Sequence, residues 1–120
     1  MVTTPQPVLP ERIVRWIRSG GGDQALLLIS VDAHLRPHLM MLARDEIFVV
    51  SPTRLRVAVG EKTQSDENLR LRSSATLAIH DLGLACIIKT RTIEGPQALL
   101  PGIVAYALAI EDVRFDAPAA

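Results

Sequence analysis

The sequence predicts a mostly β domain with two short helices, folded as a small β-barrel whose openings the helices cover. Seven stretches have the alternating or continuous apolar pattern of strands. Two short stretches, one near the start and one in the middle, have the pattern of helices. Aromatic residues make up only 3% of the chain, so the core must be built from Leu, Ile, Val and Ala.

The length and charge predict a single domain that binds neither nucleic acid nor membranes. Its 120 residues are close to the commonest domain size. We expect a disordered lead over residues 1–7, one domain over 8–116 and a short tail over 117–120. Thirteen basic and thirteen acidic residues cancel, so no general electrostatic attraction for nucleic acid or anionic lipid is expected.

The cysteine content and the apolar runs predict a cytoplasmic protein. Cys86, the single cysteine, lies in an apolar stretch and excludes an internal disulfide, which fits a reducing compartment. The sequence does not start with a basic region and an apolar run, as a signal peptide would. The longest apolar region, 98–110, is broken by Pro101-Gly102 and is shorter than the ~20 residues of a membrane span.

The first helix and the first strand are predicted at 9–18 and 25–31. Leu9, Ile13 and Ile17 recur every four residues, which is typical of an amphipathic helix, and the glycines at 20–22 are expected to end it. The apolar run over 25–31 is long enough for a strand and too short for a typical helix.

Two histidines follow this strand. His34 and His38 are four residues apart, a spacing that would favour a metal site on a helix. Pro37 lies between them in a predicted hairpin, where no such helix can form. We therefore expect no metal site.

The middle of the chain predicts strands at 38–43, 46–51, 54–60 and 75–80, with a helix between the last two. Thr63 and Asp66 have the spacing of a capping box at the start of that helix. Leu77 and Ile79 share one face of the following strand, and we expect both to be buried.

The last part predicts a strand at 84–93, a loop at 94–102 that contains Pro96 and Pro101, and a final strand at 104–113. Lys89 and Arg91 lie on one face of the first of these strands. The pair either binds an anion or lies on a solvent-exposed edge strand, where charged side chains discourage unwanted strand pairing. Both explanations remain open.

The segment after Gly60 predicts an anion site. A strand, a loop and a helix N-terminus follow one another here, and unpaired backbone N–H groups converge at the positive end of such a helix. Gly60-Glu61-Lys62-Thr63 is similar to the end of a P-loop. The upstream glycine is missing and Glu61 separates Gly60 from Lys62, which argues against a nucleoside triphosphate site.

The same segment resembles the FMN-binding split barrel, the superfamily of pyridoxamine 5'-phosphate oxidase. Those proteins typically have a glycine-containing loop, Ser-Arg-Lys, two residues and then Asn-Leu-Arg. Asn68-Leu69-Arg70 stands in place here, Thr63 takes the serine position, and Gln64 and Ser65 replace the Arg-Lys pair. The resemblance implies a small split β-barrel.

The first hairpin, from Asp32 to Pro37, is also similar to that of the family. Leu35 stands where the family commonly has a glycine. Because a leucine is strained at positive φ, we expect the turn to differ in geometry from the usual one.

The resemblance implies an FMN cofactor, a homodimer and a small-molecule ligand or substrate. In the family the second strand lines the flavin ring, so His38 and Met40 are expected beside the cofactor; core packing is an equally good explanation for Met40 and for Leu42 on the same face. The full set of predicted cofactor-binding residues is His38, Met40, Ala58, Val59, Lys62, Thr63, Gln64 and Ser65.

The loss of the Arg-Lys pair predicts that FMN binds weakly or not at all, since that pair holds the flavin phosphate in such relatives. Asp66 and Glu67 add like charge beside the same site. Two functions therefore remain open. One is a flavin-dependent oxidoreductase of unknown substrate and unknown catalytic residues. The alternative is a binding or regulatory module that has lost FMN or holds another ligand.

Overall fold

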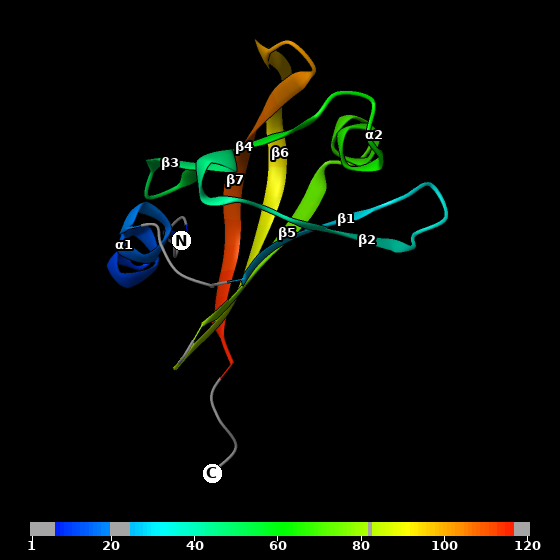
Figure 1. Cartoon of the computed structure of the whole chain (residues 1–120). Coiled ribbons are helices and arrows are strands. Elements are labelled where there is room, and N and C mark those ends of the chain that lie inside the picture. Colours follow the sequence, from blue (N-terminus) through cyan, green and yellow to red (C-terminus); the bar gives the residue numbers. More distant parts are fainter. Residues whose placement is uncertain (1–6, 20–24, 82, 117–120) are drawn as a thin grey trace, which may run out of the picture.

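The structure, a computed structural model, describes residues 7–19, 25–81 and 83–116 (Figure 1). Two α-helices and seven strands are described, together with a short 3₁₀ helix at Arg44–Glu46. In chain order the helices and strands are α1 (Glu11–Ser19), β1 (Ala25–Val31), β2 (Pro37–Met41), β3 (Ile47–Ser51), β4 (Arg54–Gly60), α2 (Gln64–Leu71), β5 (Ser74–Asp81), β6 (Leu84–Leu100) and β7 (Ile103–Phe115).

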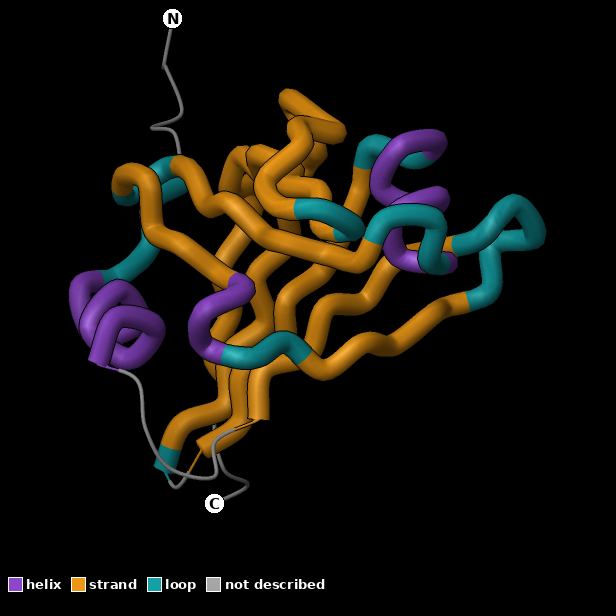
Figure 2. Tube along the Cα trace, turned by 45° about the horizontal axis from the view of Figure 1, so that its top comes forward, coloured by secondary structure: helices purple, strands orange, loops and turns teal. Residues whose placement is uncertain are grey.

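The strands form one antiparallel sheet in the order β2-β1-β5-β6-β7-β4-β3. The sheet curves around the core, and β2 and β3 are its two ends. Helix α2 packs against β1, β2, β4 and β6, whereas α1 packs against β3, so the two helices lie on different sides of the barrel (Figure 2). The prediction of a mostly β, small split barrel with two helices is confirmed.

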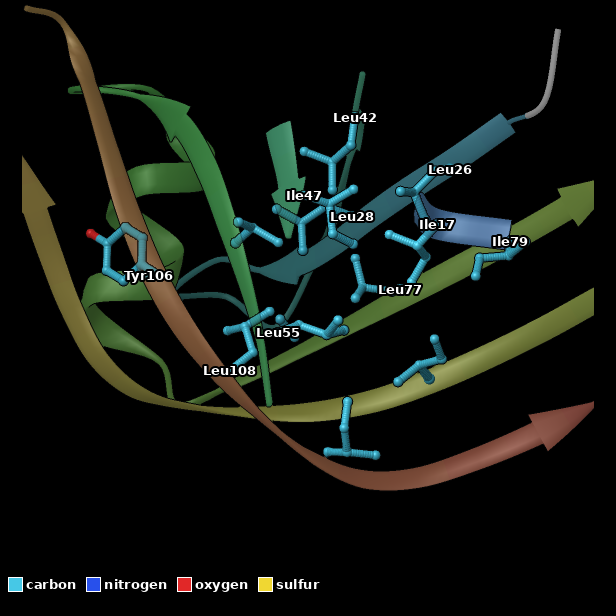
Figure 3. Packing of buried hydrophobic residues seen from close by; sticks show 14 of the residues in the cluster. Ile17, Leu26, Leu28, Leu42, Ile47, Leu55, Leu77, Ile79, Tyr106 and Leu108 are labelled. Carbon is cyan, nitrogen blue, oxygen red and sulfur yellow. The ribbon is translucent and has the colours of Figure 1, made fainter. Parts of the chain in front are cut away.

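The core fills the inside of the curved sheet (Figure 3). Leu77 and Ile79 are 0% and 2% exposed, so the predicted inward face of β5 is correct. Ile13 and Ile17 bring the apolar side of α1 into the same cluster. Tyr106 of β7 is completely buried and reaches α2 with its hydroxyl group.

The predicted loop at 94–102 is wrong, because β6 continues to Leu100 and only Pro101-Gly102 turns the chain into β7. Glu94 pairs with Ala107 and Gln97 with Ala105, so two residues of β6 lie opposite one of β7. Pro96 falls within this bulge, where the ladder is already interrupted and no backbone N–H is needed. The result is a long hairpin that extends beyond the barrel (Figure 1).

The expectation that the first hairpin avoids a positive φ is also wrong. Leu35 has a φ of 60°, in the left-handed region that favours glycine. Asp32 stabilises the turn, because its Oδ1 accepts hydrogen bonds from the backbone N–H groups of His34 (2.8 Å) and Arg36 (3.0 Å). These bonds offset the strain at Leu35.

Strand β6 lies inside the sheet, between β5 and β7. An edge strand therefore does not explain Lys89 and Arg91, and that alternative is wrong. Lys89 lies opposite Thr76 of β5 and Asp112 of β7. It is part of an exposed face of the sheet.

The predictions for the glycines at 20–22, for most of the disordered lead and for the tail fall outside the described residues. No helix in the described ranges is long and apolar enough to span a bilayer. Cys86 is buried, as its apolar surroundings in the sequence suggest.

Candidate functional site

The loop between β4 and α2 is held together by Thr63. Its hydroxyl group donates to the carbonyl oxygen of Gly60 (2.7 Å) and accepts from the backbone N–H of Asp66 (3.2 Å), which makes it the N-cap of α2 as predicted. A Cβ atom at Gly60 would lie 2.9 Å from Cγ2 of Thr63, so the loop needs a glycine there. Both hydrogen-bonding capacities of the Thr63 hydroxyl are used within the loop.

Asp66 places a carboxylate inside the loop. Its side chain is 0% exposed, and its Oδ2 accepts from the backbone N–H of Lys62 (2.8 Å) and from the guanidinium of Arg70 (2.8 Å). The hydroxyl group of Tyr106 donates to Oδ1 of the same carboxylate. In a standard capping box the acidic side chain would turn back to the N-cap N–H, whereas here it reaches Lys62, one residue earlier.

These contacts keep Asp66 ionised. Burial alone would raise the pKa of its carboxyl group, but the hydrogen bonds from Tyr106 and from the Lys62 N–H, with the nearby Arg70 charge, lower it below the ordinary value. Burial and the neighbouring carboxylate raise the pKa of Tyr106 to about 12. The tyrosine is therefore a neutral donor at physiological pH.

The other polar residues of α2 connect the helix to β1. Gln64 donates from Nε2 to Oδ1 of Asn68 (2.8 Å), and Asn68 donates from Nδ2 to the hydroxyl oxygen of Ser30 (3.0 Å). Asn68 and Ser30 are both buried. Asn68, the first residue of the Asn-Leu-Arg motif, thus fixes α2 against the sheet.

A small polar pocket, which we call the α2 pocket, lies between α2 and the β1–β2 turn. Its volume is about 170 Å³. It is lined by Asp32, Ala33, His34, Arg36, Gln64, Glu67, Asn68, Leu71 and Arg72. Two carboxylates face two guanidinium groups there, and Arg36 is already paired with Asp32 (3.0 Å). The pocket therefore has no excess of positive charge for an anion.

A larger hollow, which we call the outer groove, lies at the other end of β5 and β6. Its volume is about 500 Å³, within the range of about 300 to 1,000 Å³ that is common for small-molecule sites. Ala78, Ala85, Ile87 and Phe115 give it an apolar lining. Lys89 and Arg114 also line it, together with Ile79, His80, Cys86 and Asp116.

The outer groove is continuous with an apolar surface of the sheet. Cross-strand register puts six apolar residues of β1, β2, β5 and β6 side by side on the face away from the core. We call this surface the outer face; it consists of Leu27, Ile29, Leu39, Met41, Ala78 and Ile87. Met41 and Leu39 are 69% and 57% exposed. Contiguous exposed apolar surfaces often mark interaction sites.

The structure divides the predicted site residues among three environments. On β2, His38 and Met40 are half-buried, with Met40 packed against the core, and Leu42 after the strand is buried. At the end of β4, Ala58 and Val59 are buried. In the loop and first turn of α2, Lys62, Thr63 and Gln64 are exposed, whereas Ser65 is buried. Gln64 lines the α2 pocket.

Sequence reasoning missed the part that Asp66 and Tyr106 play together. Asp66 was interpreted as a capping acid and as like charge beside a phosphate, and Tyr106 lies 40 residues further on in an apolar strand. One signal was present. Tyr106 is the single tyrosine of the chain, and a buried tyrosine hydroxyl usually has a hydrogen-bond partner.

Among the described residues, no group of three His, Cys, Asp or Glu side chains is placed to hold a metal ion. No protein-family model matches the sequence. The comparison with curated proteins gives no match.

Solved structures share the fold over almost the whole chain. A candidate pyridoxamine 5'-phosphate oxidase from Lactobacillus delbrueckii matches with a TM-score of 0.74 and 19% identity, over 95% of this chain and 99% of that one. A second such candidate, from Listeria innocua, matches with a TM-score of 0.63 and 16% identity, over 88% and 95%. Flavoredoxin of Desulfovibrio vulgaris (Miyazaki F) has a TM-score of 0.64 and 16% identity, over 82% and 73%. The fold of this chain is that of the FMN-binding split barrels.

Proposed function

We propose that this split-barrel chain binds a flavin as a homodimer and acts as a flavin-dependent oxidoreductase. The observation that carries the proposal is the shared fold, which extends over 95% of this chain and 99% of a candidate pyridoxamine 5'-phosphate oxidase. A bound flavin supplies the redox chemistry, so the chain's own residues have to bind and orient it and keep water away.

The residues proposed to contact the flavin are those predicted from the sequence. His38 and Met40 lie on β2, and Ala58 and Val59 lie at the end of β4. Helix α2 packs against both strands, which supports a site near its N-terminus. Lys62, Thr63, Gln64 and Ser65 form the loop and first turn there.

The homodimer is proposed to form through the outer face. Its exposed leucine, isoleucine and methionine side chains would be buried by a second copy of the chain, which has an identical apolar surface. The isologous pairing would also enclose the outer groove, because Ala78 and Ile87 belong to both the face and the groove.

The fit of FMN differs between its two ends. The half-buried Met40 suits the apolar ring, but several hydrogen-bond donors at the phosphate end are already engaged. The Thr63 hydroxyl donates to Gly60, the Lys62 N–H donates to Asp66, and Ser65 is buried. The residues present therefore do not fit a phosphate group.

A second candidate function is a binding module with another ligand, and the outer groove favours it. An apolar lining with Lys89 and Arg114 suits a small amphipathic anion. In that case the flavin site on β2 and β4 would be a feature of the fold that this chain does not use.

Titration of flavins with the purified protein, followed by flavin fluorescence, tests the first function against the second. We expect saturable quenching that is weakened by Met40→Ala and unaffected by Ala85→Phe, which fills the outer groove. The opposite pattern would put the flavin in the groove. No quenching by the wild-type protein would contradict the flavin proposal and leave the binding module.

A further inference from the structure

The N-terminal region of α2 already contains an anion. The Asp66 carboxylate accepts hydrogen bonds from the Lys62 N–H, from Arg70 and from Tyr106, and its side chain is 0% exposed. The carboxylate engages three donors beside the helix N-terminus that could otherwise bind an external anion. The donors are supplied by three different elements, so the arrangement is built into the fold.

Several other donors of the loop are also engaged. The Thr63 hydroxyl donates to the carbonyl oxygen of Gly60 at 2.7 Å. The backbone N–H of Asp66 donates to Thr63, and that of Thr63 donates to Gly60 (3.3 Å). An incoming phosphate would have to break these bonds to obtain hydrogen bonds of its own.

The charge around the loop does not favour a phosphate either. Between Gly60 and Leu71 the chain has three carboxylates, on Glu61, Asp66 and Glu67, against the two cations of Lys62 and Arg70. Arg70 already forms an ion pair with Asp66 (2.8 Å). Since Arg72 follows directly and makes the formal charges equal, the loop has no excess of positive charge to attract a group with about two negative charges.

We propose that Asp66 serves as the internal anion of the β4–α2 loop, so that the loop rejects a phosphate and the chain takes a phosphate-free flavin such as riboflavin. This inference rests on the proposed flavin function for the identity of the ligand, but the rejection of phosphate by the loop does not depend on it. Asp66 is then a specificity-determining residue that acts by filling a site.

The first experiment compares FMN with riboflavin on the wild-type protein by fluorescence quenching. Riboflavin is expected to bind at least as tightly as FMN. FMN that binds tenfold or more tightly than riboflavin would overturn the inference and leave the flavin function intact. If neither flavin binds, the flavin function and the riboflavin assignment fail, and the loop is tested by the second experiment.

The second experiment uses inorganic phosphate and the full chain labelled with ¹⁵N. The backbone amide signals of residues 62–65 are followed in the wild-type protein, in Asp66→Ala and in Glu67→Ala. Saturable shifts are expected only in Asp66→Ala, where the carboxylate no longer occupies the loop. Glu67→Ala is the matched control, because it removes an exposed carboxylate from the same helix.

Two results would contradict the internal anion. One is a saturable phosphate response of these amides in the wild-type protein, and the other is a folded Asp66→Ala that gives no response. If Asp66→Ala does not fold, the wild-type titration alone decides, since it needs no variant.

Discussion

Asp66 and Tyr106 form a polar contact at the end of a mostly apolar core. The carboxylate accepts a hydrogen bond from the tyrosine hydroxyl, and the guanidinium of Arg70 balances its charge at the surface. Because a buried carboxylate without donors would be costly, each of these partners is needed to keep Asp66 in place. The contact links α2 to β7, two elements that are distant in sequence.

The lowered pKa of Asp66 predicts a specific loss of stability in acid. Its ionised form stabilises the fold fully above the unfolded-state pKa of about 3.9, and this stabilisation disappears as the pH falls through the lower folded-state value. In Asp66→Asn, the difference in free energy of unfolding from the wild-type protein should therefore shrink as the pH falls below about 4. Urea denaturation across this range measures it.

Glu67→Gln is the control for this titration, because Glu67 is exposed on the same helix. This variant removes one carboxylate from the same helix and leaves the contacts of Asp66 in place. A difference between Asp66→Asn and wild type that does not change with pH would show that Asp66 gains nothing from ionisation in the folded state.

At the scale of elements, the long β6–β7 hairpin depends on two glycines with positive φ. Gly95 has a φ of 124° and lies in the bulged part of β6, and Gly102 has a φ of 80° in the turn. A Cβ atom at Gly95 would lie 2.7 Å from Cδ1 of Tyr106 and 2.8 Å from the carbonyl oxygen of Ala105, whereas one at Gly102 would meet nothing within 4 Å. Gly95 is needed both because its φ is positive and because a side chain there would clash with its neighbours.

Gly95→Ala should consequently destabilise the protein more than Gly102→Ala. The turn variant should cost about 1–2 kcal/mol of unfolding free energy, from backbone strain alone. The strand variant adds a steric conflict with the backbone and with Tyr106, so a cost above about 2–3 kcal/mol is expected. Chemical denaturation of both variants checks the order, and equal costs would mean that the hairpin relaxes around Gly95.

The elements that were predicted correctly are those with local signals. The alternation of Leu77 and Ile79 and the capping spacing of Thr63 depend on neighbours within a few residues. The extension of β6 past Glu94 was missed because proline is a strong local signal for a loop, and only pairing with β7 shows that Pro96 falls in a bulge. Strand order could not be predicted from the sequence pattern. Alternation shows which face of a strand is buried, but it does not show which strand pairs with it.

In the candidate site, too, only the features with local sequence signals could be predicted. The loop of Lys62 to Ser65 could be located from a local motif, but the partner of Asp66 could not, because Tyr106 lies 40 residues away. Which donors are free is a property of the folded loop. Thr63 was among the residues expected to bind the cofactor, and in the structure its hydroxyl group donates to the carbonyl oxygen of Gly60.

At the scale of the whole molecule, the outer face predicts the assembly. Sedimentation of the wild-type protein at micromolar concentration should give twice the chain mass of 13.1 kDa. Met41→Glu should give monomers, because it puts a charge within an apolar contact, where charged residues are depleted. Val50→Glu, at an exposed apolar residue of β3 outside the outer face, should remain a dimer.

Two sedimentation results would contradict this assembly. A monomeric wild-type protein would exclude the dimer under these conditions. A Met41→Glu variant that dimerises as well as the wild-type protein would show that the two copies meet through another surface.

The sheet order also bears on how the chain reaches its native state. Strand β4 pairs with β7, and Gly60 is separated from its partner Ile103 by α2, β5 and β6. Contacts between such distant segments form late, since a large loop must close first, whereas the β6–β7 hairpin closes through a short turn. During synthesis on the ribosome, Leu55 and Val57 can therefore pair only with β3 until the last strand emerges. That interval is when this chain has most need of a chaperone.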